Sequence, residues 1–142
     1  MTPESFRIAI VGAGAIGGWI GAGLAQAGCP LSVWARGATL SALQTHGLRL
    51  GDQAYPVRAS HDAAALGVQD LVVVAVKAPA LREVAPQIAP LIGPHTMVLT
   101  AMNGVPWWFF EGFGGPLQGT QLHSVDASGD IARSIPAPTV IG

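Results

Sequence analysis

The stretch Ile8-Ala9-Ile10-Val11-Gly12-Ala13-Gly14-Ala15-Ile16-Gly17 decides how this chain folds. It carries the spacing G-x-G-x-x-G between an apolar run at 6–11 and a run of small and apolar residues at 15–27, which ends at Gly28. A buried strand, a glycine turn and a helix start in this order form the fingerprint of a dinucleotide-binding loop. We therefore predict a strand at 6–11 and a helix at 15–27, with the helix ending at the glycine.

Each glycine of the fingerprint has its own mechanical role. Gly12 permits the tight turn out of the strand, Gly14 lets the backbone approach a pyrophosphate, and Gly17 lets the helix pack close to the sheet. The unpaired N–H groups and the dipole at the helix start favour the phosphate charge. The residues predicted to hold the pyrophosphate are Gly12, Ala13, Gly14, Ala15, Ile16 and Gly17.

The end of the next apolar run, 31–35, indicates which dinucleotide is bound. NAD-binding proteins place an Asp or Glu about 20 residues after the fingerprint, where its carboxylate holds the ribose hydroxyls. This chain has no acidic residue between Glu4 and Asp52, and the run ends in Arg36. A guanidinium suits the 2′-phosphate of NADP through charge-assisted hydrogen bonds, so we predict NADP as the cofactor. The alternative is a solvated surface arginine.

Composition restricts the class of protein. The 142 residues suffice for one domain with a sizeable core. They are 50% hydrophobic and 11% charged, which predicts weakly polar surface for another domain or for a homo-oligomer. The net charge of -1 gives no electrostatic basis for binding nucleic acid or an anionic membrane. The single cysteine, Cys29, excludes an internal disulfide and fits the reducing cytoplasm.

The uncharged run from residue 8 to residue 35 also resembles a signal peptide or a membrane span. Glycines interrupt it after the first strand and again at 28–30, and neither apolar piece reaches the roughly 20 residues that a span needs. We therefore favour a chain with no membrane segment. The four histidines show no ligand spacing with one another or with Cys29, so we expect no metal site.

Strands alternate with helices along the rest of the chain. Further strands are predicted at 31–35, 71–76, 96–100 and 139–142, and helices at 39–45, 62–66, 80–92 and 131–135. A hairpin is expected from 48–50 and 54–59, and a loop at 112–130. This alternation predicts the α/β class, as a Rossmann-like, doubly wound, mainly parallel sheet.

Ligands bind beyond the carboxyl ends of the strands in such sheets. The strand at 71–76 leads into Lys77, the only lysine of the chain, and the strand at 96–100 leads into Asn103. If the strands are parallel, these side chains and Arg36 share one sheet edge with the glycine loop. The alternatives are a strand-end cation that reaches water for Lys77 and a turn former for Asn103. The aromatic cluster 107–110 is most simply core or domain interface, with cofactor or substrate stacking as the alternative.

These motifs together resemble the N-terminal part of the ketopantoate reductase (2-dehydropantoate 2-reductase) family. The resemblance rests on the segments 11–18, 34–36, 74–78 and 102–106. It implies NADPH-dependent reduction of 2-dehydropantoate, or of a related 2-keto acid, to the 2-hydroxy acid in pantothenate biosynthesis. It also implies that the glycine loop binds pyrophosphate and Arg36 the 2′-phosphate. Lys77 then lies near the nicotinamide, and Asn103 binds cofactor and substrate where hydride is delivered.

The resemblance covers about the first half of a typical family member. In the family, a helical C-terminal domain supplies the catalytic lysine and most substrate contacts. Residues 1–142 are therefore predicted to form an NADP-binding Rossmann domain, as a fragment or a truncated gene product, with supporting catalytic roles for Lys77 and Asn103. We expect this chain alone to be inactive. The alternative is a stand-alone NADP-binding or regulatory module without turnover.

Overall fold

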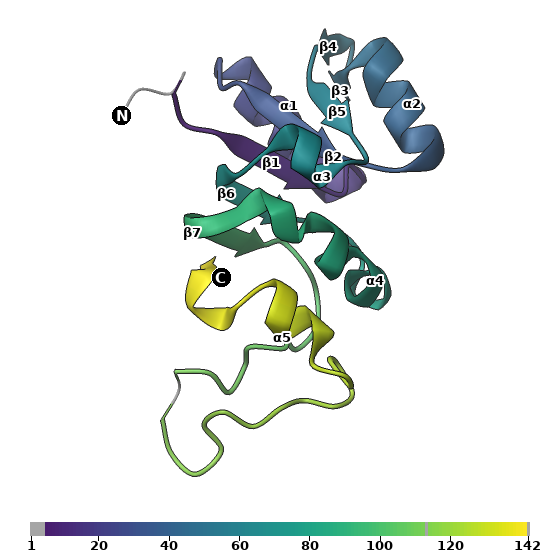
Figure 1. Cartoon of the computed structure of the whole chain (residues 1–142). Coiled ribbons are helices and arrows are strands. Elements are labelled where there is room, and N and C mark those ends of the chain that lie inside the picture. The colour runs from purple at the N-terminus through teal and green to yellow at the C-terminus, as the bar shows by residue number, and fades with distance from the viewer. Residues whose placement is uncertain (1–4, 113, 142) are drawn as a thin grey trace.

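The computed structural model describes residues 5–112 and 114–141 and contains a six-stranded sheet with helices on both faces (Figure 1). The spatial order of the strands is β5-β2-β1-β6-β7-β8, and every neighbouring pair is parallel. The strands are β1 (Ile8–Val11), β2 (Leu31–Trp34), β5 (Arg58–Ser60), β6 (Gln69–Val74), β7 (Ile92–Thr100) and β8 (Val140–Ile141). This doubly wound arrangement confirms the predicted fold class.

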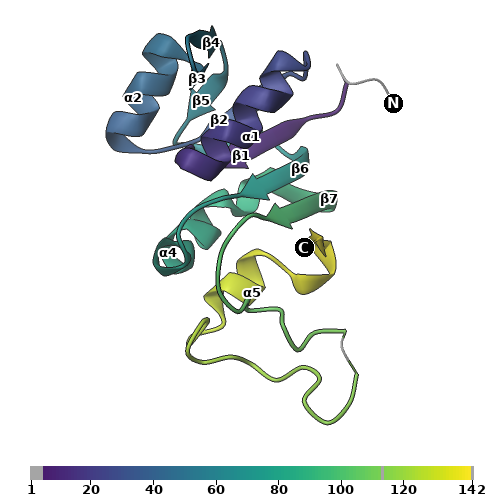
Figure 2. The same ribbon diagram turned by 180° about the vertical axis from the view of Figure 1, so that it is seen from behind.

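Helices cover both faces of the sheet. They are α1 (Ala15–Gln26), α2 (Gly37–His46), α3 (Ala63–Leu66), α4 (Ala78–Ile88) and α5 (Asp130–Ser134), with 3₁₀ turns η1 (Ala89–Leu91) and η2 (Ala137–Thr139). Side chains of β1 alternate between the faces: Ile8 and Ile10 pack with α1 and α2, whereas Ala9 and Val11 pack with α3, α4 and α5. Figure 2, seen from behind, shows α1 on the face opposite α4 and α5. The burial of three consecutive apolar residues, 72–74, in β6 follows from this double cover.

The carboxyl ends of four strands lie in one row. Val11 is in register with Trp34 on one side and with Val74 on the other, and Val74 is in register with Thr100. The chain therefore leaves β2, β1, β6 and β7 at a single edge of the sheet. This edge is where a doubly wound sheet binds its ligand.

The predicted hairpin is correct only in its first half. β3 (Leu48–Leu50) pairs antiparallel with β4 (Gln53–Tyr55), but the second predicted arm, 54–59, does not continue. Pro56 has no N–H to donate to a ladder, and the chain turns there. β5 then joins the main sheet as a parallel edge strand beside β2.

The predicted boundary between helix 80–92 and strand 96–100 was wrong. α4 begins at Ala78 and ends at Ile88, and β7 already starts at Ile92, so Gly93 and Pro94 lie in the strand. A buried hydrogen-bond chain holds this early start against β6. The backbone N–H of Gly93 donates to the hydroxyl of Thr96 (2.8 Å), which donates to the carbonyl of Gln69 (2.6 Å).

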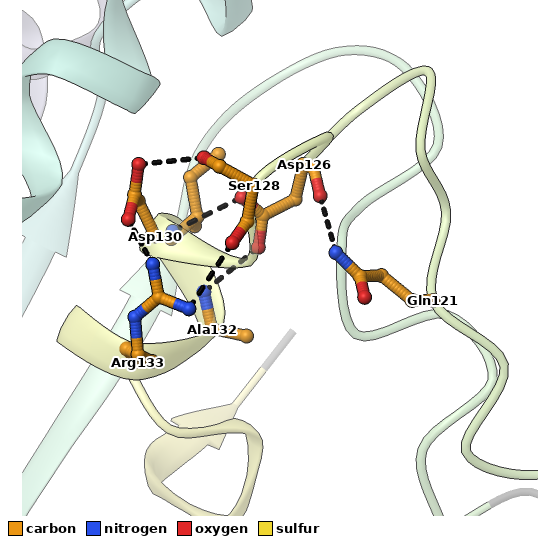
Figure 3. A network of polar contacts seen from close by, with 7 residues as sticks. Gln121, Asp126, Ser128, Asp130, Ala132 and Arg133 are labelled. Atoms are coloured by element: carbon orange, nitrogen blue, oxygen red, sulfur yellow. Dashed lines mark hydrogen bonds and ion pairs between the residues drawn. The ribbon is translucent and has the colours of Figure 1, made fainter.

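The segment between β7 and α5 forms turns and loops over its described residues, as predicted for 112–130. Its far end is fixed by Asp126, which is 2% exposed. The Asp126 carboxylate accepts the backbone N–H groups of Ile131 (3.1 Å) and Ala132 (3.0 Å), and its carbonyl accepts the Gln121 side chain at 2.8 Å (Figure 3). These contacts tie the loop to α5, which packs on α4. Phe113 and Gly142, which the predicted loop and last strand included, lie outside the described residues.

Neither a membrane span nor a metal cluster occurs in the described part of the chain. No helix within 5–112 and 114–141 has both the length and the apolar character to cross a bilayer. The same residues contain no group of three or more His, Cys, Asp or Glu side chains placed to hold a metal ion.

Candidate functional site

The three fingerprint glycines occupy different environments. Gly12 leaves β1 with φ +92°, a conformation that favours glycine, and a Cβ there would meet Val76 at 2.8 Å. A Cβ on Gly17 would lie 1.9 Å from the carbonyl oxygen of Gly12, so α1 packs backbone to backbone on the turn. A Cβ on Gly14 would meet nothing within 4 Å. The fold therefore requires glycine at 12 and 17, whereas the glycine at 14 keeps open space in front of the loop.

A cavity of about 370 Å³ opens beside this loop. It lies between the turn after β1, the end of β2 and one side of α4. Its lining residues are Gly12, Ala13, Gly14, Trp34, Ala35, Arg36, Thr39, Val76, Ala80 and Val84. A second cavity, of about 590 Å³, shares Ala13 and Gly14 and extends under the exposed Trp19 toward α2 and β3. The loop therefore borders open volume along its length, as a bound pyrophosphate requires.

Arg36 lies at the rim of the 370 Å³ cavity, as the N-cap residue of α2. Its guanidinium lies over the Trp34 ring, 5.4 Å from the centroid. The indole N–H of Trp34 donates to the His61 carbonyl at 2.9 Å, which fixes the ring under the guanidinium. Nη1 of Arg36 also forms an ion pair of 2.7 Å with Oε1 of Glu83 from α4. The side chains remain 41% and 70% exposed, respectively.

Glu83 is the residue of this site that sequence reasoning missed. NAD-binding proteins carry the ribose-binding acid shortly after the fingerprint, and this chain has no acidic residue there. Glu83 lies 47 residues beyond Arg36, on a helix whose packing brings it to the same rim. No motif or spacing connects the two positions, so only the tertiary fold reveals the pair.

Lys77 does not follow its strand directly, as predicted, because two residues separate it from the end of β6. β6 ends at Val74 rather than at residue 76, and Lys77 is the exposed N-cap residue of α4. Its carbonyl accepts the backbone N–H of Ala80 at 2.9 Å, and Pro79 lies in the first helical turn. The next residue, Ala78, lines two further cavities, which also contain Asn103 and are described next.

Asn103 is exposed between two adjoining cavities. One, of about 250 Å³, is lined mainly by apolar residues of α4, α5 and the loop after β7. The other, of about 490 Å³, includes Arg82, His123 and Ser124. The structure therefore places Asn103 at the common sheet edge but against different cavities from those at Arg36. The short segment from Val76 to Ala78, which leads into α4, connects the two regions, because Val76 lines the cavity at Arg36 and Ala78 lines those at Asn103.

The aromatic cluster 107–110 is partly core. Trp107 is 6% exposed and packs with α4 and α5, which agrees with the simpler of its two interpretations. Phe109 is 42% exposed and meets Phe110 edge to face at 5.1 Å between centroids. The indole N–H groups of Trp107 and Trp108 are buried without a hydrogen-bond partner.

The residues present fit a dinucleotide with a charged adenosine end. An open glycine at the start of α1 suits a pyrophosphate, and a guanidinium held on an aromatic ring suits a further phosphate or an adenine face. Asn103 can donate and accept hydrogen bonds at the far side of α4. The arrangement can therefore hold an elongated anionic cofactor along the sheet edge.

Comparison with known proteins places this architecture in a family. The family model described as "Ketopantoate reductase PanE/ApbA" matches residues 8–106. A 2-dehydropantoate 2-reductase from Mesorhizobium japonicum is 54% identical over 141 residues, which is 96% of this chain and 43% of that protein. The chain thus spans less than half the length of the curated relative it matches.

Solved structures agree with this placement. A crystal structure assigned as a ketopantoate reductase, from Ralstonia solanacearum MolK2, is 63% identical with a TM-score of 0.91, covering 95% of this chain and 43% of that one. A D-mandelate dehydrogenase in complex with NADH is 28% identical with a TM-score of 0.63, covering 71% of this chain and 32% of that one. Because the family model covers most of its length and its sheet is parallel throughout, this chain belongs to the ketopantoate reductase family.

Proposed function

We propose that this chain forms the NADP(H)-binding half of a reductase that converts 2-dehydropantoate, or a related 2-keto acid, to the 2-hydroxy acid. The observation that carries the proposal is that three features lie along one edge of the sheet. They are the open glycine at position 14, the guanidinium of Arg36 and the amide of Asn103. A lone cysteine and the metabolic role of the relatives favour a cytoplasmic location.

The chain's own residues divide the work of holding the cofactor. Backbone N–H groups at the start of α1 face the pyrophosphate, and the missing Cβ of Gly14 leaves it room. Arg36 pairs with the 2′-phosphate and discriminates against a cofactor that lacks it. When bound, the reduced nicotinamide supplies the hydride.

Lys77 and Asn103 act at the other end of the site. The amide N–H of Asn103 can donate to the carbonyl oxygen of the substrate and orient it, but an amide does not release a proton readily at neutral pH. Lys77 adds positive charge where alkoxide charge develops. The group that donates the proton to the new hydroxyl is expected in the part of the relatives that this chain does not cover. This chain by itself is therefore expected to bind the cofactor without turning over the substrate; the alternative function is a stand-alone NADP-binding or regulatory module.

The test compares this chain with a chimera in which the remaining residues of the Mesorhizobium relative follow it. We expect the chain to bind NADPH by calorimetry without oxidising it in the presence of 2-dehydropantoate, and the chimera to oxidise it. Absence of nucleotide binding would reject the proposal. Robust turnover by the chain alone would place the proton donor within it, with Lys77 as the first residue to substitute.

A further inference from the structure

Glu83 is held at the rim of the dinucleotide cavity by the packing of its helix. Its neighbours Leu81, Val84 and Ala85 are buried in the core, which fixes the rotation and position of α4. Ala80 and Val84 line the 370 Å³ cavity, so the same helix forms one of its walls. The Glu83 carboxylate therefore reaches the cavity rim from a rigid element.

Arg36, the ion-pair partner of Glu83, is also held in position by its surroundings. Arg36 caps α2, and its carbonyl accepts the backbone N–H of Leu40 at 3.3 Å. The contact with the Trp34 ring limits where the guanidinium can lie, and the ion pair with Glu83 occupies its Nη1 at 2.7 Å. An exposed ion pair of this kind adds little to stability. The ion pair instead affects any ligand that binds the Arg36 guanidinium, because that ligand must compete with Glu83.

We propose that Glu83 sets the discrimination between NADP(H) and NAD(H), because its carboxylate competes with a 2′-phosphate for Arg36 and accepts hydrogen bonds from an unphosphorylated ribose. The inference rests on the proposed function, since it assumes that the cavity at Arg36 receives the adenosine end of the cofactor. It assigns to α4 the acidic group that NAD-binding proteins carry at the end of the second strand.

Electrostatics gives the carboxylate opposite effects on the two cofactors. A phosphate ester carries about −1.5 to −2 charge near neutral pH, so it repels a carboxylate at the same guanidinium. The phosphate must displace the carboxylate from the guanidinium or share the guanidinium with it. A ribose hydroxyl is neutral and can donate to that carboxylate while it accepts from Arg36. Glu83 therefore weakens the binding of NADP(H) and strengthens the binding of NAD(H). The preference that Arg36 creates is smaller than the arginine alone would give.

Binding measurements on this chain test the inference without any need for turnover. Four ligands are titrated by calorimetry: NADP⁺, NAD⁺, adenosine 2′,5′-bisphosphate and adenosine 5′-monophosphate. The last two isolate the adenosine end and differ by the 2′-phosphate. The proteins are the unaltered chain, Glu83→Gln and the control Glu111→Gln, which makes the same chemical change on an exposed loop residue that lines none of the cavities described above.

Glu83→Gln should bind NADP⁺ and the bisphosphate about two- to fivefold more tightly, the usual range for one exposed ion pair. The same variant should bind NAD⁺ and the monophosphate more weakly, because both present an unphosphorylated ribose that loses the charged acceptor. Glu111→Gln should match the unaltered chain with all four ligands. The ratio of NADP⁺ to NAD⁺ affinity is the decisive quantity, since a general effect of net charge would move both cofactors together.

The outcomes separate the inference from the function on which it rests. If the unaltered chain binds none of the four ligands, the proposed function fails and the inference fails with it. If the unaltered chain binds NADP⁺ but Glu83→Gln leaves the ratio unchanged, only the inference is overturned. Weaker NADP⁺ binding by Glu83→Gln would also overturn it, because Glu83 would then position Arg36 for the phosphate rather than compete with it.

Discussion

A Cβ atom on Gly17 would lie 1.9 Å from the carbonyl oxygen of Gly12. The first turn of α1 therefore rests on the backbone of the turn that follows β1, and no side chain fits between them. This contact places the start of the helix, with its unpaired N–H groups, at the edge of the sheet. It couples the fold of the fingerprint to the position of the anion-binding end of α1.

Gly17→Ala should destabilise the chain by about 1–3 kcal/mol, because the backbone must shift to admit the methyl group. The matched control is Gly23→Ala on the same helix, where an added Cβ meets nothing within 4 Å. That variant should gain up to about 1 kcal/mol through helix propensity. Urea unfolding followed by circular dichroism measures both. Equal stabilities for the two variants would contradict the close packing described for Gly17.

Gly14→Val should lose nucleotide binding while it keeps the fold. The backbone of Gly14 has φ −74°, which valine adopts, and its surroundings are open to 4 Å. The branched side chain would fill the space in front of the loop, so NADPH affinity should fall by about tenfold or more. Calorimetry gives the affinity and circular dichroism the fold. Normal binding by this variant would show that the phosphates lie elsewhere.

Arg36→Ala should remove the preference for NADPH over NADH. A charge-assisted contact to a 2′-phosphate contributes about 1–3 kcal/mol, and the unaltered chain should show a margin within that range. The variant should bind NADPH more weakly and should no longer prefer it to NADH, because Glu83 still lies at the same rim. Parallel calorimetric titrations measure the margin. Equal affinities of the unaltered chain for the two cofactors would count against the role given to Arg36.

Asp126→Ala should destabilise the segment that closes the Asn103 cavities by about 1–3 kcal/mol, because two backbone N–H groups of α5 lose their acceptor. Ser124→Ala, which alters another exposed residue of the same loop, serves as the control. The amides of Ile131 and Ala132 should exchange with deuterium faster in the first variant alone. Unchanged protection of both amides would show that the carboxylate does not hold the helix.

The stability of the folded chain at acidic pH should depend on the ionisation of Asp130. A hydrogen bond from the Ser128 hydroxyl, joined by the Arg133 guanidinium, holds the pKa of Asp130 below its ordinary value (Figure 3). A group with a lowered pKa stabilises the folded chain above its unfolded pKa, and that stabilisation is lost as pH falls through the folded pKa. In a carbon-13 NMR titration, Ser128→Ala should raise the pKa of Asp130. An unchanged titration curve would contradict this assignment.

The parts of the fold that were predictable from the sequence depend on interactions between neighbouring residues. The fingerprint predicted β1, the turn and α1, because a strand, a positive-φ glycine and a small-residue helix start are local properties of residues 8–17. Alternation of apolar runs with helix signals likewise predicted the parallel sheet and one common edge for Arg36 and Asn103. Cofactor contacts at these residues remain predictions that the binding experiments test.

Features that join segments distant in the sequence depend on how whole elements pack. β7 begins at Ile92 because Thr96 hydrogen-bonds across 27 residues to Gln69, a contact that outweighs the local breaking tendency of Gly93 and Pro94. Glu83 meets Arg36 because burial of α4 fixes the helix beside the end of β2. A sequence pattern records which residues are near in the chain, whereas these pairings are set by the packing free energy of whole elements.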